Sequence, residues 1–333
     1  MQSGIESIGV EPRIAKRSLP PGTVVSSMRS TQSVLARLPD GATDTLFQQA
    51  DLPETRVSQR RYFSPYGIAY DSAREGFWLA DKLNASIWFL TASADAMPNS
   101  LIAEKEYRHG SLSEPCGLDF HPRNGLLIGG YGDSTLGTPG GVFQLADDRL
   151  TPLVQFATRE RVTHCCWLPD GGFCYVTRSD SILWHCPEPG QAARPLTLRG
   201  ERMLCPDSGP LGQLRLRYVH GLVYSPLQQC ILIADAALGA IYKVDLRHEE
   251  FSLYFGRPTL GHSNSIADVR DDPNVWLGRI AAMAEDTDGS IVWLEGSRGN
   301  WFRFRENRIE AMGPALPGGQ GGPLLGCGVT IVR

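Results

Sequence analysis

The sequence has no long apolar run and no recognisable targeting segment. No stretch approaches the ~18 to 20 consecutive apolar residues that a membrane helix requires. Residues 1–20, MQSGIESIGVEPRIAKRSLP, lack the apolar centre of a signal peptide. We therefore expect a cytoplasmic protein with no membrane partner.

Basic tracts and common catalytic motifs are lacking too. Acidic residues outnumber basic ones by 36 to 32, the formal net charge is -4, and no run of Lys and Arg is long enough to follow a phosphate backbone. Nucleic acid is therefore not an expected partner. The chain has no GxxxxGK phosphate loop, GxSxG elbow, HExxH helix or CxxC pair. None of these short motifs is therefore present to indicate a reaction type.

Disulfide bonds are not expected, although the chain has 8 cysteines. Without a secretory signal, cysteines are by default reduced thiols. Cys174 and Cys230 lie within apolar strand patterns, where a thiol packs as a small hydrophobe.

Turn-forming residues, in contrast, are abundant. With 36 Gly and 23 Pro, the composition disfavours a helical bundle and favours many short strands. A pattern of three apolar strands and polar turns runs through residues 65–90 and returns at 115–145, 163–185, 220–244 and, more weakly, 282–304. A sixth copy is divided between residues 327–332 and residues 23–38.

The spacing of these copies predicts the fold. The equivalent points are Gly67, Gly117, His164, Gly221, Ala282 and Gly328. A repeat of about 40 to 50 residues with four strands is typical of a propeller blade. We predict an all-β, six-bladed β-propeller with four antiparallel strands per blade over residues 22–333, in which N- and C-terminal strands share one blade. Residues 1–21 are expected to form a flexible arm.

The blade pattern also carries a family resemblance. It reads P-x-G-(I/L)-x-(Y/F)-D, then an apolar strand ending in Ala-Asp, then N-x-x-I, and in this form it resembles the NHL repeat. The segment IADAALGAIYKVD is similar to strictosidine synthase-like and senescence-marker/gluconolactonase propellers. The resemblance implies this fold, which hosts hydrolases, lyases, ring-forming enzymes and binding scaffolds.

In a propeller of this kind, the residue that starts each inner strand and the loop after the second strand open on one face around the central channel. The expected substrate-binding residues at these places are Tyr66, Asp81, Cys116, Tyr131, Arg178, Arg298 and Cys327. His262 joins them from the long connection 256–279, because long loops over a rigid scaffold often carry specificity.

Four residues are candidates for acid–base catalysis. His220 starts an inner strand where other blades have Tyr or Cys, and Asp235, at the end of the next strand, is expected to orient its ring. His164 places a second imidazole nearby, and Glu295 follows an apolar strand as in strictosidine synthase-like enzymes, where a glutamate serves as acid or base. The alternatives are a locally hydrogen-bonded His220 and a Glu295 engaged in a salt bridge with Arg298.

A single zinc ion in the channel is a further hypothesis. The resemblance to the amidating-enzyme lyase implies imidazoles around the axis, and Cys116, His220 and Cys327 fall on alternate blades in a Cys2His set. The calcium ligands of the lactonase relatives are not reproduced, since Tyr66 and Cys116 are not hard oxygen donors.

The sequence thus indicates an enzyme that acts on a small organic molecule by acid–base chemistry, as a hydrolase, lyase or ring-forming cyclase, for example in secondary metabolism. The alternative is a non-catalytic propeller that binds a peptide, a protein or a metabolite on the same face.

Overall fold

The structure is a computed structural model, and it describes residues 6–9, 18–52, 62–92, 100–132, 137–156, 160–199, 205–256, 277, 279–296, 299–316 and 326–333. Strands dominate these residues, with three short 3-10 helices: η1 (Gln49–Asp51), η3 (Lys82–Asn84) and η4 (Leu211–Gln213). Within the described residues, no helix has the length and apolar character to cross a membrane. The chain divides into two units, residues 1–162 with 325–333, and residues 163–324.

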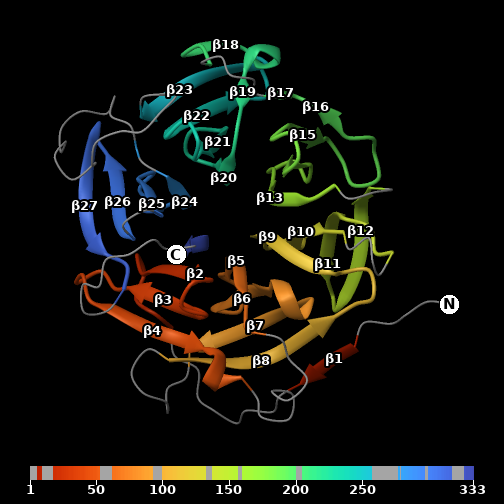
Figure 1. Cartoon of the computed structure of the whole chain (residues 1–333), viewed down its shortest axis with the longest axis vertical. Coiled ribbons are helices and arrows are strands. Elements are labelled where there is room, and N and C mark those ends of the chain that lie inside the picture. The colour runs from red at the N-terminus through yellow and green to blue at the C-terminus, as the bar shows by residue number, and fades with distance from the viewer. Residues whose placement is uncertain are drawn as a thin grey trace. The chain divides into compact units, whose positions relative to one another are not determined.

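The first unit contains three sheets (Figure 1). The first has the order β28-β2-β3-β4, with β28 (Gly326–Ile331), β2 (Val24–Met28), β3 (Ser33–Arg37) and β4 (Thr43–Gln48). The second has the order β1-β8-β7-β6-β5, with β1 (Glu6–Gly9), β8 (Leu101–Arg108), β7 (Ser86–Ala92), β6 (Gly76–Asp81) and β5 (Pro65–Asp71). The third has the order β12-β11-β10-β9, with β12 (Arg149–Gln155), β11 (Gly141–Ala146), β10 (Gly125–Tyr131) and β9 (Glu114–His121).

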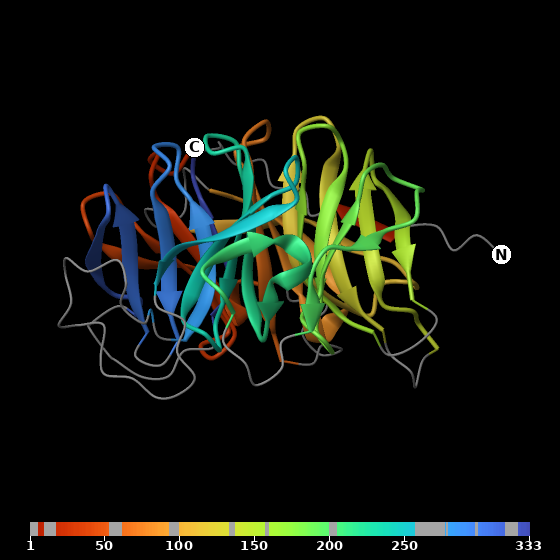
Figure 2. The same cartoon turned by 90° about the horizontal axis from the view of Figure 1, so that it is seen from above.

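The second unit contains three larger sheets and a short parallel pair (Figure 1), and Figure 2 views the strands from a second side. The first sheet is β13 (Val162–Trp167), β14 (Phe173–Thr177), β15 (Leu183–Cys186) and β16 (Arg194–Pro195). The second has the order β18 (Ser208–Pro210), β23 (Glu250–Gly256), β22 (Ala240–Asp245), β21 (Cys230–Asp235) and β20 (Val219–Ser225). The third is β24 (Ile280–Glu285), β25 (Ile291–Glu295), β26 (Asn300–Arg305) and β27 (Arg308–Pro314), and the parallel pair is β17 (Leu198–Arg199) with β19 (Arg215–Leu216).

The predicted fold class is confirmed. The chain is an all-β, six-bladed propeller whose six sheets follow the predicted repeat, three in each unit. One blade is built from both ends of the chain, because β28 pairs with β2 from Val24–Ile331 to Met28–Gly326. The Gly22 amide donates to the Val332 carbonyl at 2.9 Å and extends this pairing.

Apolar side chains from neighbouring sheets pack together within each unit. In the first unit, Trp88 and Phe77 belong to one such cluster and Trp78 and Phe143 to another. Phe77 and Trp78 are adjacent on β6 and enter different clusters because successive residues of a strand point to opposite faces. Every residue of β6, β21 and β25 is buried, which explains the nearly continuous apolar runs of these strands.

The cysteines follow the sequence prediction. The seven described ones, all but Cys327, are buried and form no disulfide bond among the residues described. Burial raises the pKa of Cys230 to about 11 and raises that of Cys174 further, so both are protonated at neutral pH.

The segment predicted as an N-terminal arm contributes one short strand. β1 pairs antiparallel with β8, with Glu6 opposite Arg108, and adds a fifth strand to its blade. Leu19 is buried in an apolar cluster of the first unit. That the rest of residues 1–21 is flexible stays a prediction.

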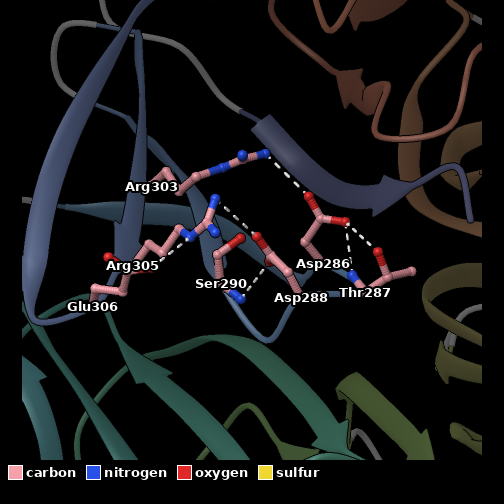
Figure 3. Close-up of polar contacts among 7 residues, drawn as sticks. All are labelled: Asp286, Thr287, Asp288, Ser290, Arg303, Arg305 and Glu306. Carbon is pink, nitrogen blue, oxygen red and sulfur yellow. Dashed lines mark hydrogen bonds and ion pairs between the residues drawn. The ribbon is translucent and has the colours of Figure 1, made fainter.

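Polar contacts fix the hairpin between β24 and β25 (Figure 3). The Asp286 carboxylate lies 3.1 Å from the Arg303 guanidinium and accepts a hydrogen bond from the Thr287 amide at 2.7 Å. Asp288 accepts from the Ser290 amide at 2.9 Å, and its second oxygen lies 3.5 Å from Arg305. The Asp residues of this turn therefore bind the hairpin to β26.

Candidate functional site

Five of the predicted strand-start residues occupy β-bulges. In β20, Val219 pairs with Asp235 and Gly221 with Ala234, so that His220 is the extra residue. Register shifts in β5, β9, β24 and β28 coincide in the same way with Tyr66, Cys116, Ala281 and Cys327. A bulge bends the strand and redirects its side chain. The repeat thus places one redirected residue at the start of each of these inner strands.

The glycine after the bulge allows neighbouring inner strands to approach closely. A Cβ atom at Gly67 would lie 2.0 Å from the Cys116 carbonyl oxygen, and one at Gly328 would lie 2.7 Å from that of Tyr66. Real Cβ contacts are never so short, and the obstructing atoms belong to backbone. The glycine of the repeat is therefore required for packing between inner strands.

Asp81 and Asp235 stabilise the backbone of their blades. The buried carboxylate of Asp235 accepts hydrogen bonds from the amides of Arg217 at 2.6 Å, Ala237 at 2.9 Å, Leu238 at 3.1 Å and Tyr218 at 3.4 Å. These hydrogen bonds lower the pKa of Asp235, but burial has the larger effect and raises it above its ordinary value.

Asp81 does the same in its blade, since it accepts from the Ser64 amide at 3.1 Å and from the Asn84 side chain at 2.8 Å. The expected pairing of Asp235 with His220 is corrected, because no hydrogen bond joins them and the Asp235 oxygens are occupied by backbone amides.

Glu295 occupies the position that corresponds to these aspartates. It ends β25 and pairs with Ile280, as Asp235 pairs with Val219. Its side chain is 6% exposed, and its carbonyl accepts from the Gly299 amide at 2.9 Å. Its catalytic role stays a prediction.

His220 contacts the next inner strand. Its Nδ1 atom lies 3.3 Å from the Ala281 carbonyl oxygen. A carbonyl only accepts, so this hydrogen bond requires the tautomer with the proton on Nδ1, which leaves the Nε2 lone pair available as a base.

Two further rings lie beside His220. The centroid of Tyr218 is 4.3 Å away, with the ring planes inclined by 55°, and that of His164, on β13, is 6.1 Å away, inclined by 47°. The Nδ1 atom of His164 is inaccessible to solvent and has no hydrogen-bond partner among the residues described. The predicted juxtaposition of the two imidazoles is thus present within the second unit, on neighbouring inner strands.

Both imidazoles are neutral at physiological pH. Burial, together with the positive charges of Arg279 and Arg178, lowers the pKa of His220 to about 4, against the raising effect of the Ala281 hydrogen bond. Burial and the neighbouring His220 lower the pKa of His164 to about 3. A neutral imidazole both donates and accepts a hydrogen bond, so the pair is able to receive a proton from a bound molecule and return it.

In the first unit, two predicted residues contact a lysine. The ammonium nitrogen of Lys82 lies 4.1 Å from the ring centroid of Tyr131 and 5.1 Å from that of Tyr66. Cys116 is fully buried, and its thiol lies 3.4 Å from the Glu114 carbonyl oxygen.

One other predicted site residue lies near His220, and three lie outside the described part. Arg178 directly follows β14, is exposed, and its positive charge contributes to the lowered pKa of His220. His262, Arg298 and the side chain of Cys327 lie outside the described residues. Among the described residues, no group of three or more His, Cys, Asp and Glu side chains has an arrangement that suits a metal ion. The zinc hypothesis stays a prediction.

Tyr218, Arg279 and Lys82 were not predicted. Tyr218 lies two residues before His220, a spacing that places side chains on one face of a strand, so this signal was present in the sequence. Arg279 likewise lies two residues before Ala281, at the corresponding place in the next blade.

No protein-family model matches the sequence, and no curated protein matches it significantly. Solved structures do match. A chain of the nidogen/laminin complex has a TM-score of 0.63 at 8% identity, over 94% of this chain and 99% of that chain. Virginiamycin B lyase from Staphylococcus aureus, as a catalytically inactive histidine-to-alanine variant with quinupristin, has a TM-score of 0.56 at 10% identity, over 98% and 96% of the two chains.

A protein of unknown function from Bacteroides caccae is also similar, with a TM-score of 0.56 at 9% identity, over 94% of this chain and 100% of that chain. At such identities the likeness shows the fold alone. One of these structures is an enzyme and another comes from a protein–protein complex, so the fold is compatible with both functions expected from the sequence.

Proposed function

We propose that this chain is an enzyme that moves a proton on a small organic molecule, with His220 as the general base. The observation that carries the proposal is the His220–Ala281 contact, which holds Nδ1 protonated and leaves Nε2 able to accept a proton. His164 is the partner that exchanges protons with the same substrate, since its ring lies beside that of His220.

The electrostatics of the site favour an anionic substrate. Arg279 and Arg178 lower the pKa of His220 in the free protein. A bound negative charge offsets these two positive charges and raises the pKa of His220 towards neutrality, where a general base is most effective. Substrate binding would thus increase the basicity of the residue that needs it.

Many hydrolases, lyases and ring-forming enzymes use a general base to remove a proton from water or from the substrate, and the site supports this step. In virginiamycin B lyase, replacement of one histidine by alanine gives a catalytically inactive protein. A propeller of this fold is therefore able to depend on a single histidine. The analogy supports the proposal, while the resemblance to the NHL and strictosidine synthase-like propellers gives the fold.

The test is a search for proton transfer in D2O. Purified protein is incubated with quinupristin and a panel of anionic esters, lactones and hydroxy acids, and deuterium incorporation and product formation are measured by mass spectrometry. We expect at least one compound to react, and His220→Gln to slow that reaction by 100-fold or more. His248→Gln is the matched control, because His248 is exposed and pairs only with Asp245 at 2.8 Å.

Unchanged turnover in His220→Gln would exclude this residue as the base. If a compound of the panel raises the melting temperature but is neither converted nor deuterated, the alternative function as a binding scaffold is favoured instead.

A further inference from the structure

Tyr218 contacts His220 directly, but the proposed function gives it no role. Both residues lie in the second unit, and both side chains are partly buried. The centroids of the two rings are 4.3 Å apart and the ring planes are inclined by 55°. Rings at this separation are in van der Waals contact, and such contacts stabilise the orientation of both partners. Tyr218 therefore limits how far the imidazole is able to turn.

The hydrogen bond to Ala281 holds the imidazole of His220 only weakly. Its Nδ1–oxygen distance is 3.3 Å, whereas most N–H···O bonds have about 2.9 to 3.0 Å. Among the residues described, the side chain of His220 makes no other hydrogen bond. A half-turn of the ring about its Cβ–Cγ bond would put the Cδ2 carbon in the place of Nδ1 and break this bond. A second contact is therefore needed to keep the ring in its orientation.

Four hydrogen bonds hold the backbone that carries Tyr218. The Asp235 carboxylate accepts from the amides of Arg217 at 2.6 Å and Tyr218 at 3.4 Å. The Arg217 carbonyl accepts from the Ser181 hydroxyl at 2.8 Å. The Tyr218 carbonyl accepts from the Ala236 amide at 2.8 Å. Each amide and carbonyl of the two residues thus has a partner, so the Tyr218 ring extends from a fixed backbone.

One of these four hydrogen bonds comes from a residue with a strained backbone. Ser181 has a φ of 54°, in the left-handed region that few residues other than glycine adopt, and it is 4% exposed. It lies in the connection between β14 and β15, and its hydroxyl reaches Arg217, 36 residues later in the chain. Strain of this kind is often found at functional sites. A glycine at this position would relieve the strain but would not provide the hydrogen bond.

We propose that Tyr218 is a positioning residue, whose ring keeps the imidazole of His220 turned so that Nδ1 donates to the Ala281 carbonyl. Ser181 and Asp235 act one step further away, because they hold the backbone of Tyr218. The value of this orientation for catalysis rests on the proposed function, in which Nε2 is the base. The orientation itself requires no substrate, so it is measured in the free protein.

The experiment determines the tautomer of His220 by NMR in the full chain labelled with 15N-histidine. Two-bond correlations between ring protons and ring nitrogens distinguish an imidazole protonated on Nδ1 from one protonated on Nε2. The chain has 7 histidines, and the signals that His220→Gln removes identify those of His220. At neutral pH we expect the wild-type ring to be protonated mainly on Nδ1, because the hydrogen bond to Ala281 selects this tautomer.

Removal of the Tyr218 ring should release the imidazole. We expect Tyr218→Ala to lower the ratio of Nδ1-protonated to Nε2-protonated His220 about three- to tenfold, as expected for the loss of a contact between two rings. Tyr218→Phe keeps the ring and should change the ratio by less than about twofold. Tyr224→Ala is the matched control, since Tyr224 is also partly buried and belongs to β20. Among the residues described, the rings in contact with His220 are those of Tyr218 and His164.

Ser181→Gly tests the support of the backbone without changing any ring. Glycine adopts a positive φ without strain, so this variant should fold, and we expect it to lower the same ratio about twofold.

Three results would overturn the proposal: a wild-type His220 protonated mainly on Nε2, an unchanged ratio in Tyr218→Ala, or an equal effect of Tyr224→Ala. If Tyr218→Ala fails to fold, an unchanged ratio in Ser181→Gly overturns it instead. None of these results depends on turnover. If the ratio responds as expected but no compound reacts, the proposed function fails while the positioning role of Tyr218 stands.

Discussion

The Nδ1 atom of His220 and the carbonyl oxygen of Ala281 lie 3.3 Å apart, although 60 residues separate them in the chain. Both are the extra residues of β-bulges in neighbouring inner strands. The same irregularity that redirects the histidine therefore also exposes the carbonyl that determines its tautomer. Two copies of one repeat thus build a functional contact that neither copy contains alone.

Stability should fall in mild acid because of the buried histidines. The pKa of His220 is lowered to about 4 and that of His164 to about 3, whereas an unfolded histidine titrates near 6.5. Between these values the unfolded chain binds more protons than the folded one, so the free energy of unfolding decreases as the pH falls from 7 towards 4 and is level above 7.

We expect a loss of about 3 to 4 kcal/mol between pH 7 and pH 5, measured by urea unfolding. His121 and His185, whose pKa values burial also lowers, add to this slope. The double variant His164→Gln/His220→Gln should show a clearly flatter dependence. An identical slope in wild type and double variant would contradict the neutrality of both rings.

Removal of the Asp235 carboxylate should unfold much of its blade. Asp235→Ala leaves four backbone amides without their acceptor, and hydrogen bonds to a charged group are each worth about 1.5 to 3 kcal/mol. We expect a loss of at least about 3 kcal/mol by denaturant unfolding. Asp235→Asn keeps one acceptor oxygen and should cost less. A stability of Asp235→Ala within about 0.5 kcal/mol of the wild type would contradict this role in holding the backbone.

The packing role of the repeat glycine is tested at Gly67. In Gly67→Ala, the new Cβ would lie 2.0 Å from the Cys116 carbonyl and 2.9 Å from the Leu118 amide, and neither backbone atom is able to move cheaply. We expect a loss of about 3 kcal/mol or more, by calorimetry. Gly212→Ala is the matched control, because a Cβ there meets no atom within 4 Å, and it should change stability by less than about 0.5 kcal/mol. Equal effects of the two substitutions would refute the role of Gly67.

Two ion pairs of one hairpin should differ in their contribution (Figure 3). The Arg303 and Asp286 side chains are 22% and 10% exposed, and those of Arg305 and Asp288 are 51% and 37% exposed. Arg303→Met leaves a nearly buried carboxylate unpaired and should cost about 2 kcal/mol or more, whereas Arg305→Met should cost less than about 1 kcal/mol. Thermal unfolding at pH 7 checks the order, and the reverse order would show that exposure does not govern these pairs.

The fold and the positions at which the inner strands start were predictable because they repeat. Tyr66, Cys116 and His220 stand at one point of a recurrent pattern, and the register places each of them in the same bulge. Six copies of the same pattern support one assignment of the strands and their register. A single strand of five or six residues would not determine its register.

The contacts between blades were less predictable. The sequence shows a carboxylate at Asp235 and an imidazole at His220, but not that backbone amides converge on the former. Lys82 and Arg161 meet on Tyr131 from positions 79 residues apart, and no local pattern links them. Contacts between side chains that are far apart in the sequence depend on how the blades pack. The pattern within one blade does not predict this packing.

The pairing of β2 with β28 has a consequence for synthesis on the ribosome. β2 emerges early, but the strand that completes its sheet is made almost 300 residues later, so its edge stays unpaired while the other blades form. The nascent chain must keep this edge from pairing with other chains until residues 326–331 arrive. Slow release of those residues, rather than slow folding of any blade, would then decide how much of the protein escapes aggregation in the cell.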